Sequence, residues 1–360
     1  MKRVAVARAL KLIGCDFATV SLFHRVDVTP GGGYTITLRI RPGANVDELV
    51  AKKMNLSTAL NVEEIDIKRI APRLVELIAR PPMPKELPDY PTYIHTDIVP
   101  PRTPHSIPIG IDGDGLVAYL PLFDEAGGSV SLVAGNPGSG KSSALQIIVA
   151  SLIQTPTVIV WFDPKGGADA AKFSKRVDVV QDSIDAKSVE SKLRQLNRVV
   201  MRRANALADG FDLGLVSNIV VLVDEWASLG VDGNKKEREA VEEQLRRLAA
   251  TGRACKVSLV LATQRPTSTT IDVATRGLAT TRLVFAVGDV HASIAALGAP
   301  GAEQLHPMRD RGVAFLNDAV RLRKVRMFRV PVDLQATAFA NQGMKMTIDE
   351  LDSWEESCLR

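Results

Sequence analysis

The sequence predicts an α/β protein whose larger part is a doubly wound parallel sheet, preceded by a small α+β domain. Three observations in the 360-residue chain support this fold class. Short apolar runs alternate with helical stretches in the second part of the chain. A glycine-rich phosphate-binding motif lies between one such run and a predicted helix. A proline-rich stretch separates this region from a shorter one with a different pattern.

Residues 1–80 are predicted to form the small α+β domain. An amphipathic helix is expected over 45–61, and a glycine turn at 31–33 joins two strand-like segments into a hairpin. The strand-like segments are 18–28, 34–41, 62–70 and 73–80. Residues 81–109 contain nine of the chain's 20 prolines. They predict an extended linker, because proline neither continues a helix nor donates to a sheet.

Residues 110–330 are predicted to form the larger domain. Five apolar runs without polar alternation suit parallel strands that helices cover on both faces. The runs are 129–135, 157–163, 218–225, 256–263 and 282–287. Helices are expected at 141–154, 185–208 and 236–252, and a hairpin of 312–317 and 325–330 at one edge of the sheet. Residues 331–360 are predicted to be an acidic C-terminal tail.

Composition excludes several classes of protein. The chain is 46% hydrophobic and 24% charged, which excludes a mostly disordered protein. No run of about 18 apolar residues encodes a membrane span. Arg8 and Lys11 interrupt the apolar N-terminus, which makes it a poor signal peptide. Three widely spaced cysteines fit neither a disulfide framework nor a zinc site, so we expect a cytoplasmic protein. The net charge of +4 is too small to indicate nucleic-acid binding by itself.

The strongest functional signal is a full Gly-x-x-x-x-Gly-Lys-Ser motif, which follows an apolar run and opens a helix. Its glycines let backbone N–H groups turn toward phosphate oxygens, and the helix N-terminus adds its positive dipole end. Lys141 is expected to bridge the outer phosphates of ATP, and the Ser142 hydroxyl to ligate Mg²⁺. The predicted nucleotide-binding residues are Gly135, Asn136, Pro137, Gly138, Ser139, Gly140, Lys141, Ser142, Ser143 and Asp224.

Two acidic residues end the apolar run at 218–225. The carboxyl ends of parallel strands meet at the sheet edge where ligands bind. We therefore expect Asp224 to hold Mg²⁺, directly or through water, and Glu225 to polarise the attacking water as general base. Capping of the next helix is the alternative role for this pair. Gln264, at the end of another run, is either a sensor that contacts the γ-phosphate or a polar loop residue.

Several segments together resemble the FtsK/SpoIIIE family of DNA-translocating motor ATPases. Residues 161–169 resemble the Asp-Pro-Lys-Gly-Gly strand end of that family, and 223–229 resemble its acidic strand. Residues 251–271 resemble its glutamine strand, and 280–317 its late core. Residues 35–61 resemble the small domain that precedes the motor.

This resemblance implies a RecA-like P-loop NTPase core that hydrolyses ATP. It also implies a homo-oligomeric ring, expected to be a hexamer, around double-stranded DNA. ATP would lie between subunits, where an arginine from the neighbour stabilises charge on the transferred phosphoryl group. Arg282 is the first candidate for this arginine by motif position, and Arg253 and Arg265 are alternatives. The predicted catalytic residues are Lys141, Glu225, Gln264 and Arg282.

A ring motor must grip the phosphate backbone, because it steps along any sequence. The candidate contacts are polar loops at 165–172, 265–270 and 232–238, of which the last is more typical of a solvated helix start. Helix 185–208 has a basic face that suits DNA or a neighbouring subunit, although a solvated face is the preferred interpretation. The tryptophans Trp161 and Trp226 are predicted to be core residues.

Neither N-terminal membrane helices nor a C-terminal winged helix is expected, in contrast to family members that act in chromosome segregation. The short architecture is more similar to transfer proteins of actinobacterial plasmids and integrative elements. That similarity implies a motor recruited to the membrane or to a conjugation machinery. An ATPase for protein secretion is the alternative within the same family. A nucleotide-dependent scaffold or a small-molecule kinase fits less well, because the acidic pair or the glutamine strand would then have no role.

Overall fold

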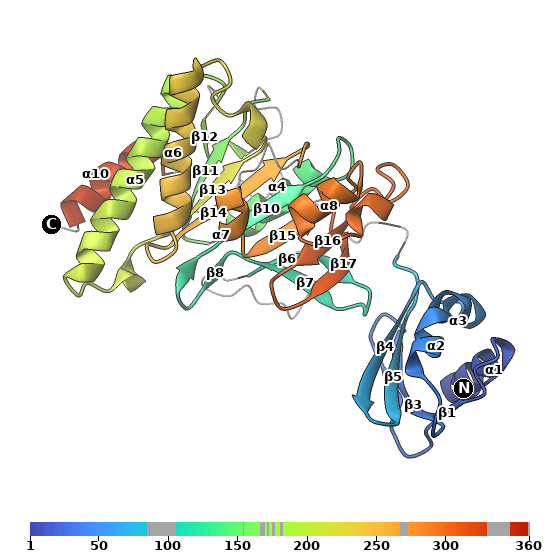
Figure 1. Cartoon of the computed structure of the whole chain (residues 1–360). Coiled ribbons are helices and arrows are strands. Elements are labelled where there is room, and N and C mark those ends of the chain that lie inside the picture. The colour runs from blue at the N-terminus through green and yellow to red at the C-terminus, as the bar shows by residue number, and fades with distance from the viewer. Residues whose placement is uncertain are drawn as a thin grey trace. The chain divides into compact units, whose positions relative to one another are not determined.

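The computed structural model describes residues 1–84, 86, 106–153, 155–165, 170, 173–174, 177–180, 183–266, 273–329 and 346–358. Contacts divide the chain into two units (Figure 1). The first unit contains Met1–Glu86 and Ile111–Ala118, and the second contains Leu87–Gly110 and Tyr119–Arg360. Most of the predicted linker lies outside the described residues, but its last residues, 106–109, belong to a strand, β6.

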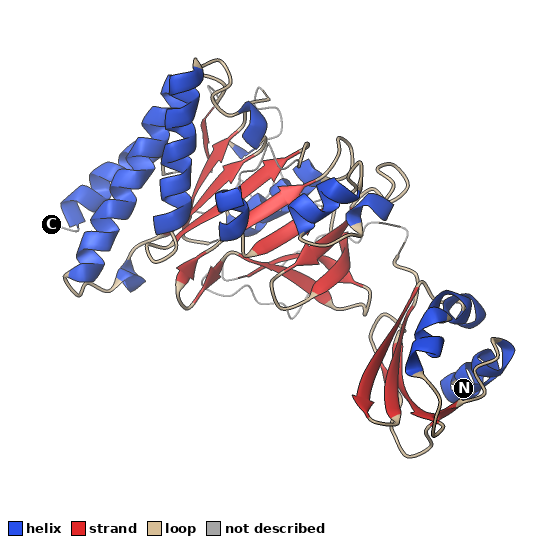
Figure 2. Cartoon of the chain, in the orientation of Figure 1, coloured by secondary structure: helices blue, strands red, loops and turns tan. Residues whose placement is uncertain are grey.

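The first unit is a small sheet with helices on one face (Figure 2). Its strands pair antiparallel in the order β1-β3-β5-β4, with β2 beside β3. They are β1 (Ala18–Val20), β2 (Asp27–Val28), β3 (Tyr34–Ile40), β4 (Glu64–Ala71) and β5 (Leu74–Arg80). Alternate residues of β5 are buried, which is the pattern of a sheet with one covered face. Both predicted strand pairs are confirmed, but the predicted strand 18–28 is divided into β1 and β2, and residues 21–26 between them are not in a strand.

The helices of this unit differ from the prediction in two ways. The segment 45–61 forms two helices, α2 (Val46–Ala51) and α3 (Lys53–Leu60), because Lys52 between them leaves helical geometry with φ −90° and ψ 10°. Helix α1 (Lys2–Leu12) has no counterpart in the prediction. Its Val6, Ala9 and Leu10 follow helical spacing and are buried in the core of the unit.

A ten-stranded sheet dominates the second unit, in the order β12-β11-β13-β14-β10-β15-β16-β17-β6-β7. The strands from β12 to β15 in this order pair parallel, whereas β15–β16 and β16–β17 pair antiparallel. The strands are β6 (Ser106–Asp112), β7 (Val117–Pro121), β10 (Val130–Ala134), β11 (Thr157–Phe162), β12 (Asp178–Val180), β13 (Asn218–Val223), β14 (Val257–Thr263), β15 (Thr281–Val284), β16 (Val313–Asn317) and β17 (Leu322–Met327). A separate pair consists of β8 (Phe123–Asp124) and β9 (Gly127–Gly128).

The five predicted parallel strands are confirmed as β10, β11, β13, β14 and β15. Every residue from Ile219 to Val223 in β13 has 0% exposure, so both faces of the sheet are covered there. The predicted hairpin is formed by β16 and β17, but its position at the edge of the sheet is wrong. β6 and β7 extend the sheet beyond β17, and β12 lies at the other edge.

Three predicted helices are confirmed as α4 (Lys141–Leu152), α5 (Ala186–Ala208) and α6 (Lys235–Thr251). The shorter helices α7 (Val273–Leu278) and α8 (Val290–Leu297) follow β14 and β15. Helices α5 and α6 share an apolar core with β11, β13 and β14. None of the described helices is both long and apolar enough to span a membrane.

The predicted acidic tail contains helix α10 (Ile348–Cys358), which packs along α5 (Figure 1). Its Ile348 and Leu351 are fully buried in the core shared with α5. The acidic residues of α10 pair with basic residues of α5: Asp349 with Lys192, Asp352 with Arg198 and Arg202, and Glu355 with Arg203. The preferred interpretation of the basic face of α5 as solvated is confirmed only in part. Arg194 and Arg198 are more than half exposed, whereas α10 covers Arg202 and Arg203.

Candidate active site

The phosphate-binding loop connects β10 to α4 at the carboxyl edge of the parallel strands. Gly138 and Gly140 have φ angles of +79° and +127°, which L side chains rarely adopt. A Cβ atom on Gly140 would lie 2.9 Å from the Phe285 ring and 3.2 Å from the Cα of Gly312. A Cβ atom on Gly138 would meet nothing within 4 Å. The loop is therefore packed against the protein on one side and open on the other.

The open side of the loop borders a cavity of about 320 Å³. Its lining residues are Asn136, Pro137, Gly138, Gly140, Lys141, Ser142, Ser143, Gln146, Gln264 and Arg311. The helix N-cap, Gly140, offers no side-chain acceptor to the first N–H groups of α4, which leaves them available to an anion. Ser139 is buried behind the loop, where its Oγ donates to the Asn136 carbonyl at 2.7 Å. This combination of free N–H groups and cations fits a triphosphate.

Lys141 points from the loop toward the acidic pair. Its Nζ lies 2.5 Å from both the Oδ1 atom and the carbonyl oxygen of Asp224. Both side chains are almost fully buried, with 4% and 2% exposed. Burial lowers the pKa of the Lys141 ammonium, while the Asp224 carboxylate opposes that shift. The structure thus brings together the lysine predicted to bridge the phosphates and the aspartate predicted to hold Mg²⁺.

Glu225 lies beside Asp224 and is joined to the end of β14. Its Oε1 accepts a hydrogen bond from Thr263 Oγ1 at 2.8 Å, and its Oε2 accepts one from the Gln264 backbone N–H at 3.0 Å. Gln264 in turn lines the cavity. These contacts do not support the alternative role, in which the acidic pair only caps the next helix. The side chain of Glu225 makes no capping hydrogen bond. The predicted Lys141, Asp224, Glu225 and Gln264 therefore form one cluster.

A second lysine reaches this cluster from the end of β11. Lys165 Nζ lies 3.4 Å from Asp224 Oδ2 and 4.0 Å from Glu225 Oε2. Its backbone N–H donates to Asp163 Oδ1 at 3.0 Å. Asp163 is 1% exposed, and burial together with the Asp224 charge raises the pKa of its carboxyl. The sequence assigned Lys165 to a DNA-contact loop, whereas its amino group lies at the acidic pair.

Comparison with known proteins shows what this part of the chain resembles. The model of the FtsK/SpoIIIE family matches residues 212–268, which include Asp224, Glu225 and Gln264. Over this segment the chain is similar to the FtsK/SpoIIIE family. The predicted resemblance and the predicted P-loop ATPase core are thereby confirmed.

Two relatives illustrate the range of the FtsK/SpoIIIE family. DNA translocase FtsK of Tropheryma whipplei (strain TW08/27) is 27% identical over 305 residues, or 76% of this chain and 40% of that protein. The type VII secretion system protein EssC of Staphylococcus aureus (strain NCTC 8325 / PS 47) is 27% identical over 265 residues, or 62% of this chain and 18% of that protein. The chain therefore spans less than half the length of these relatives.

Solved structures share the fold. The pCW3 conjugation coupling protein TcpA, in its monomer form with ATPγS, superposes with a TM-score of 0.63 at 19% identity, covering 94% of this chain and 98% of that one. The cytoplasmic domain of the Thermomonospora curvata type VII secretion ATPase EccC superposes with a TM-score of 0.57 at 23% identity. The superposition covers 69% of this chain and 32% of that one. At these identities the similarity establishes the α/β architecture.

Three arginines were predicted as candidates to complete the ATP site of a neighbouring subunit: Arg282, Arg253 and Arg265. None of them lines the phosphate-loop cavity of its own subunit. Arg282 is half-buried near the amino end of β15 and donates from Nη2 to the Arg276 carbonyl at 3.0 Å. Burial, with the Arg276 charge, lowers the pKa of Arg282. Arg253 precedes β14, is exposed, and pairs with Asp124 at 2.7 Å. Arg265 is exposed just beyond the carboxyl end of β14.

The predicted DNA-contact loops are only partly described. Residues 166–169, 171–172 and 267–270 lie outside the described residues. In the third loop, Asn234 and Glu237 form a reciprocal capping box at the start of α6. This confirms the interpretation of that loop as a helix start.

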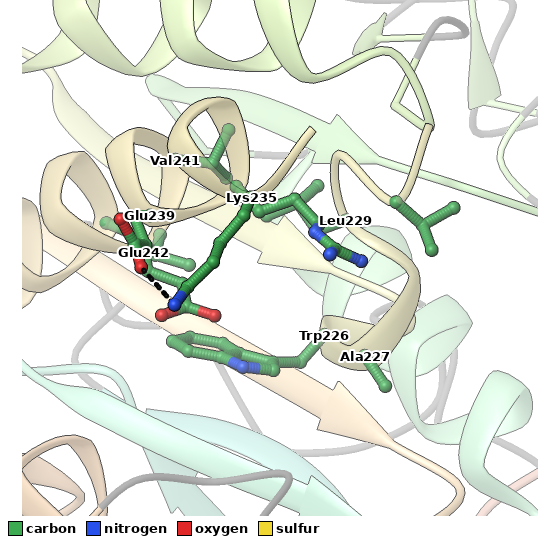
Figure 3. A pocket seen from close by; sticks show the side chains of 10 residues that line it. Trp226, Ala227, Leu229, Lys235, Glu239, Val241 and Glu242 are labelled. Carbon is green, nitrogen blue, oxygen red and sulfur yellow. Dashed lines mark ion pairs between the residues drawn. The ribbon is translucent and has the colours of Figure 1, made fainter. Parts of the chain in front are cut away.

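A second cavity, of about 410 Å³, begins at the residue after Glu225 (Figure 3). Trp226 lies along one side, and the ion pair of Lys235 with Glu239, 3.8 Å apart, lies across from it. Trp226 was predicted to be a core residue, and it does pack against the core while one side lines this cavity. Trp161 is fully buried, as predicted.

Sequence reasoning did not assign three residues to this site: Thr263, Lys165 and Arg311. Thr263 directly precedes Gln264, so its position at the strand end was a usable signal. Lys165 lies in the Asp-Pro-Lys-Gly-Gly segment, whose resemblance was noted without a catalytic role. Arg311 carried no local signal, because only the sheet order brings the start of β16 to the phosphate-binding loop.

Proposed function

We propose that the chain is an ATP-driven double-stranded DNA translocase that works as a homo-oligomeric ring, expected to be a hexamer. One observation carries the ATPase part of this proposal: Glu225 is held by Thr263 and Gln264 beside the Lys141–Asp224 pair and the open phosphate-binding loop. Relatedness to a protein named DNA translocase FtsK, and a fold shared with a conjugation coupling protein, support DNA as the polymer.

Each residue of the cluster has a role in hydrolysis. Lys141 and the first N–H groups of α4 bind the outer phosphates, which requires Lys141 to give up part of its contact with Asp224. Ser142 and Asp224 offer the hydroxyl and carboxylate oxygens that Mg²⁺ prefers, and a bound Mg²⁺ would neutralise phosphate charge. Glu225 accepts the proton of the attacking water through its carboxylate. Gln264 connects the cavity to Glu225 and thereby senses loss of the γ-phosphate.

In the proposed ring, ATP lies between subunits and the neighbour supplies an arginine. We expect the backbone phosphates of DNA to contact the loops at 165–172 and 265–270 through residues other than Lys165, whose amino group lies at the acidic pair. We place the motor in the cytoplasm, recruited to the inner face of the membrane by a conjugation machinery in the course of element transfer.

The test measures ATP turnover with and without long linear duplex DNA at low salt, together with displacement of the third strand of a triplex. We expect duplex DNA to raise turnover and the strand to be displaced. Glu225→Gln should bind ATP but turn over about a hundredfold more slowly, because the general base is lost. The matched control is Glu239→Gln, on an exposed glutamate of α6.

Two results contradict this proposal at different points. Normal turnover by Glu225→Gln would remove Glu225 from the role of base. Turnover by the parent protein that ignores duplex DNA, with no strand displaced, would overturn the translocase.

A protein-secretion ATPase is the second candidate, because EssC is as similar in sequence as FtsK. In that case DNA does not change the rate of ATP turnover. A secreted substrate peptide that the protein captures raises this rate instead.

A further inference from the structure

Arg311 lines the phosphate-loop cavity, and no residue in the described part of the chain pairs with its guanidinium group. The residue is exposed, and within the described part of the chain its side chain makes no hydrogen bond or ion pair. The preceding arginine in the chain, Arg309, is instead paired with Asp310 at 3.5 Å. A cation that borders an anion-binding cavity and has no carboxylate partner is available to a ligand.

The backbone around Arg311 is fixed to the phosphate-binding loop. The N–H group of Gly312 donates to the Ser139 carbonyl at 2.8 Å. The Arg311 carbonyl accepts a hydrogen bond from Arg326 Nη1 at 3.0 Å. Gly312 also lies close to Gly140, because a Cβ atom added to Gly140 would lie 3.2 Å from the Cα atom of Gly312. Arg311 is therefore held at a defined position beside the loop, although its side chain is exposed.

The sheet order decides which end of the nucleotide Arg311 meets. Asp224, Glu225 and Gln264 follow β13 and β14, on one side of β10. Arg311 precedes β16, two strands away on the other side of β10. Because Lys141 points toward the acids, the terminal phosphate belongs on their side. The α-phosphate and the nucleoside then lie toward Arg311.

We infer that Arg311 is a nucleotide-binding residue that contacts the α-phosphate and nucleoside end of ATP bound to its own subunit. This inference rests on the proposed function only in taking ATP as the ligand. Since this end of the molecule is the same in ATP and ADP, Arg311 contributes equally to binding both. It contributes to substrate binding rather than to stabilisation of the transition state.

The test compares Arg311→Ala, Arg311→Lys and the control Arg309→Ala in the full chain without DNA. Dissociation constants for fluorescent ATP and ADP analogues are measured by titration, and kcat and KM by ATP turnover. For Arg311→Ala we expect both dissociation constants and KM to rise about tenfold, as for the loss of one charge-assisted hydrogen bond, with kcat changed less than about twofold. Arg311→Lys should recover part of the affinity, and Arg309→Ala should bind like the parent.

Three outcomes count against the assignment. If the parent binds both nucleotides and Arg311→Ala binds them equally well, the assignment is wrong while the proposed function stands. A loss confined to ATP would place Arg311 at the terminal phosphate and overturn the assignment to the nucleoside end. A parent that binds neither nucleotide would overturn the proposed function together with this inference.

Discussion

The site is organised around Asp224, whose two carboxylate oxygens each meet an ammonium group. Lys141 lies 2.5 Å from Oδ1 and Lys165 lies 3.4 Å from Oδ2. Burying a carboxylate is costly unless it is paired, and two adjacent acids need two compensating cations. Lys141 and Lys165 provide this compensation for Asp224 and Glu225. In the proposed function, a bound triphosphate would compete for Lys141. Lys165, together with any Mg²⁺ on Asp224, would then compensate the charge of the acids.

We therefore expect Lys165→Met to lower kcat about tenfold while the dissociation constant for ATP changes less than about threefold, because Lys165 positions the acids and does not line the cavity. Lys165→Arg should restore part of the turnover, and Lys187→Met, on an exposed lysine of α5, should have no effect. Turnover is measured at saturating ATP and DNA. Unchanged kcat with weaker, less salt-dependent DNA binding would return Lys165 to the DNA-contact role that the sequence predicted.

Among the elements, α10 has the clearest structural role. It contributes Ile348 and Leu351 to the core and covers Arg202 and Arg203 on the basic face of α5. Arg203 and Glu355 join the two helices through an ion pair in which both side chains are 0% exposed. Arg203 also donates to the Cys255 and Ser217 carbonyls, so α10 is tied indirectly to the strands β13 and β14. The C-terminal helix is thus part of the second unit and not an appendage.

Glu355→Ala should lower the free energy of unfolding by about 3–5 kcal/mol, because it leaves the Arg203 charge buried without a compensating carboxylate. The control Asp349→Ala, whose carboxylate is 59% exposed, should cost less than about 1 kcal/mol. Denaturant unfolding followed by the fluorescence of the adjacent Trp354 measures both. Equal effects of the two substitutions would contradict a special role for the buried pair. The double variant Arg203→Met with Glu355→Leu should recover most of the loss.

For the whole molecule, the sheet order determines which arginines can serve a neighbouring subunit. Parallel strands place their amino ends at the edge opposite the phosphate-binding loop, and both Arg253 and Arg282 lie there. Neither can therefore reach the cavity of its own subunit. Arg253 is 52% exposed and, among the described residues, forms an ion pair only with the exposed Asp124. Arg282 instead donates to the Arg276 carbonyl. This favours Arg253 over the first candidate, Arg282.

In a ring, Arg253→Ala should lower DNA-stimulated kcat by about a hundredfold or more with ATP binding intact, because the neighbour's transition state loses its arginine. Mixing this variant with Glu225→Gln should restore part of the turnover, since some interfaces then combine a normal Arg253 with a normal Glu225. Arg247→Ala, on an exposed arginine of α6, is the control. Full activity of Arg253→Ala alongside an inactive Arg282→Ala would give the role to Arg282.

Local patterns in the sequence determined the five parallel strands, the three long helices, the phosphate-binding loop and the Asp224–Glu225 pair. Each depends on residues close together in the chain, so periodicity and motif spacing suffice to predict it. Tertiary structure decided the rest. Helix α10 forms against α5, β6 extends a sheet begun by distant strands, and Lys165 and Arg311 join the site only because non-adjacent strands are neighbours. Such placements depend on contacts between residues far apart in the chain, which no local pattern encodes.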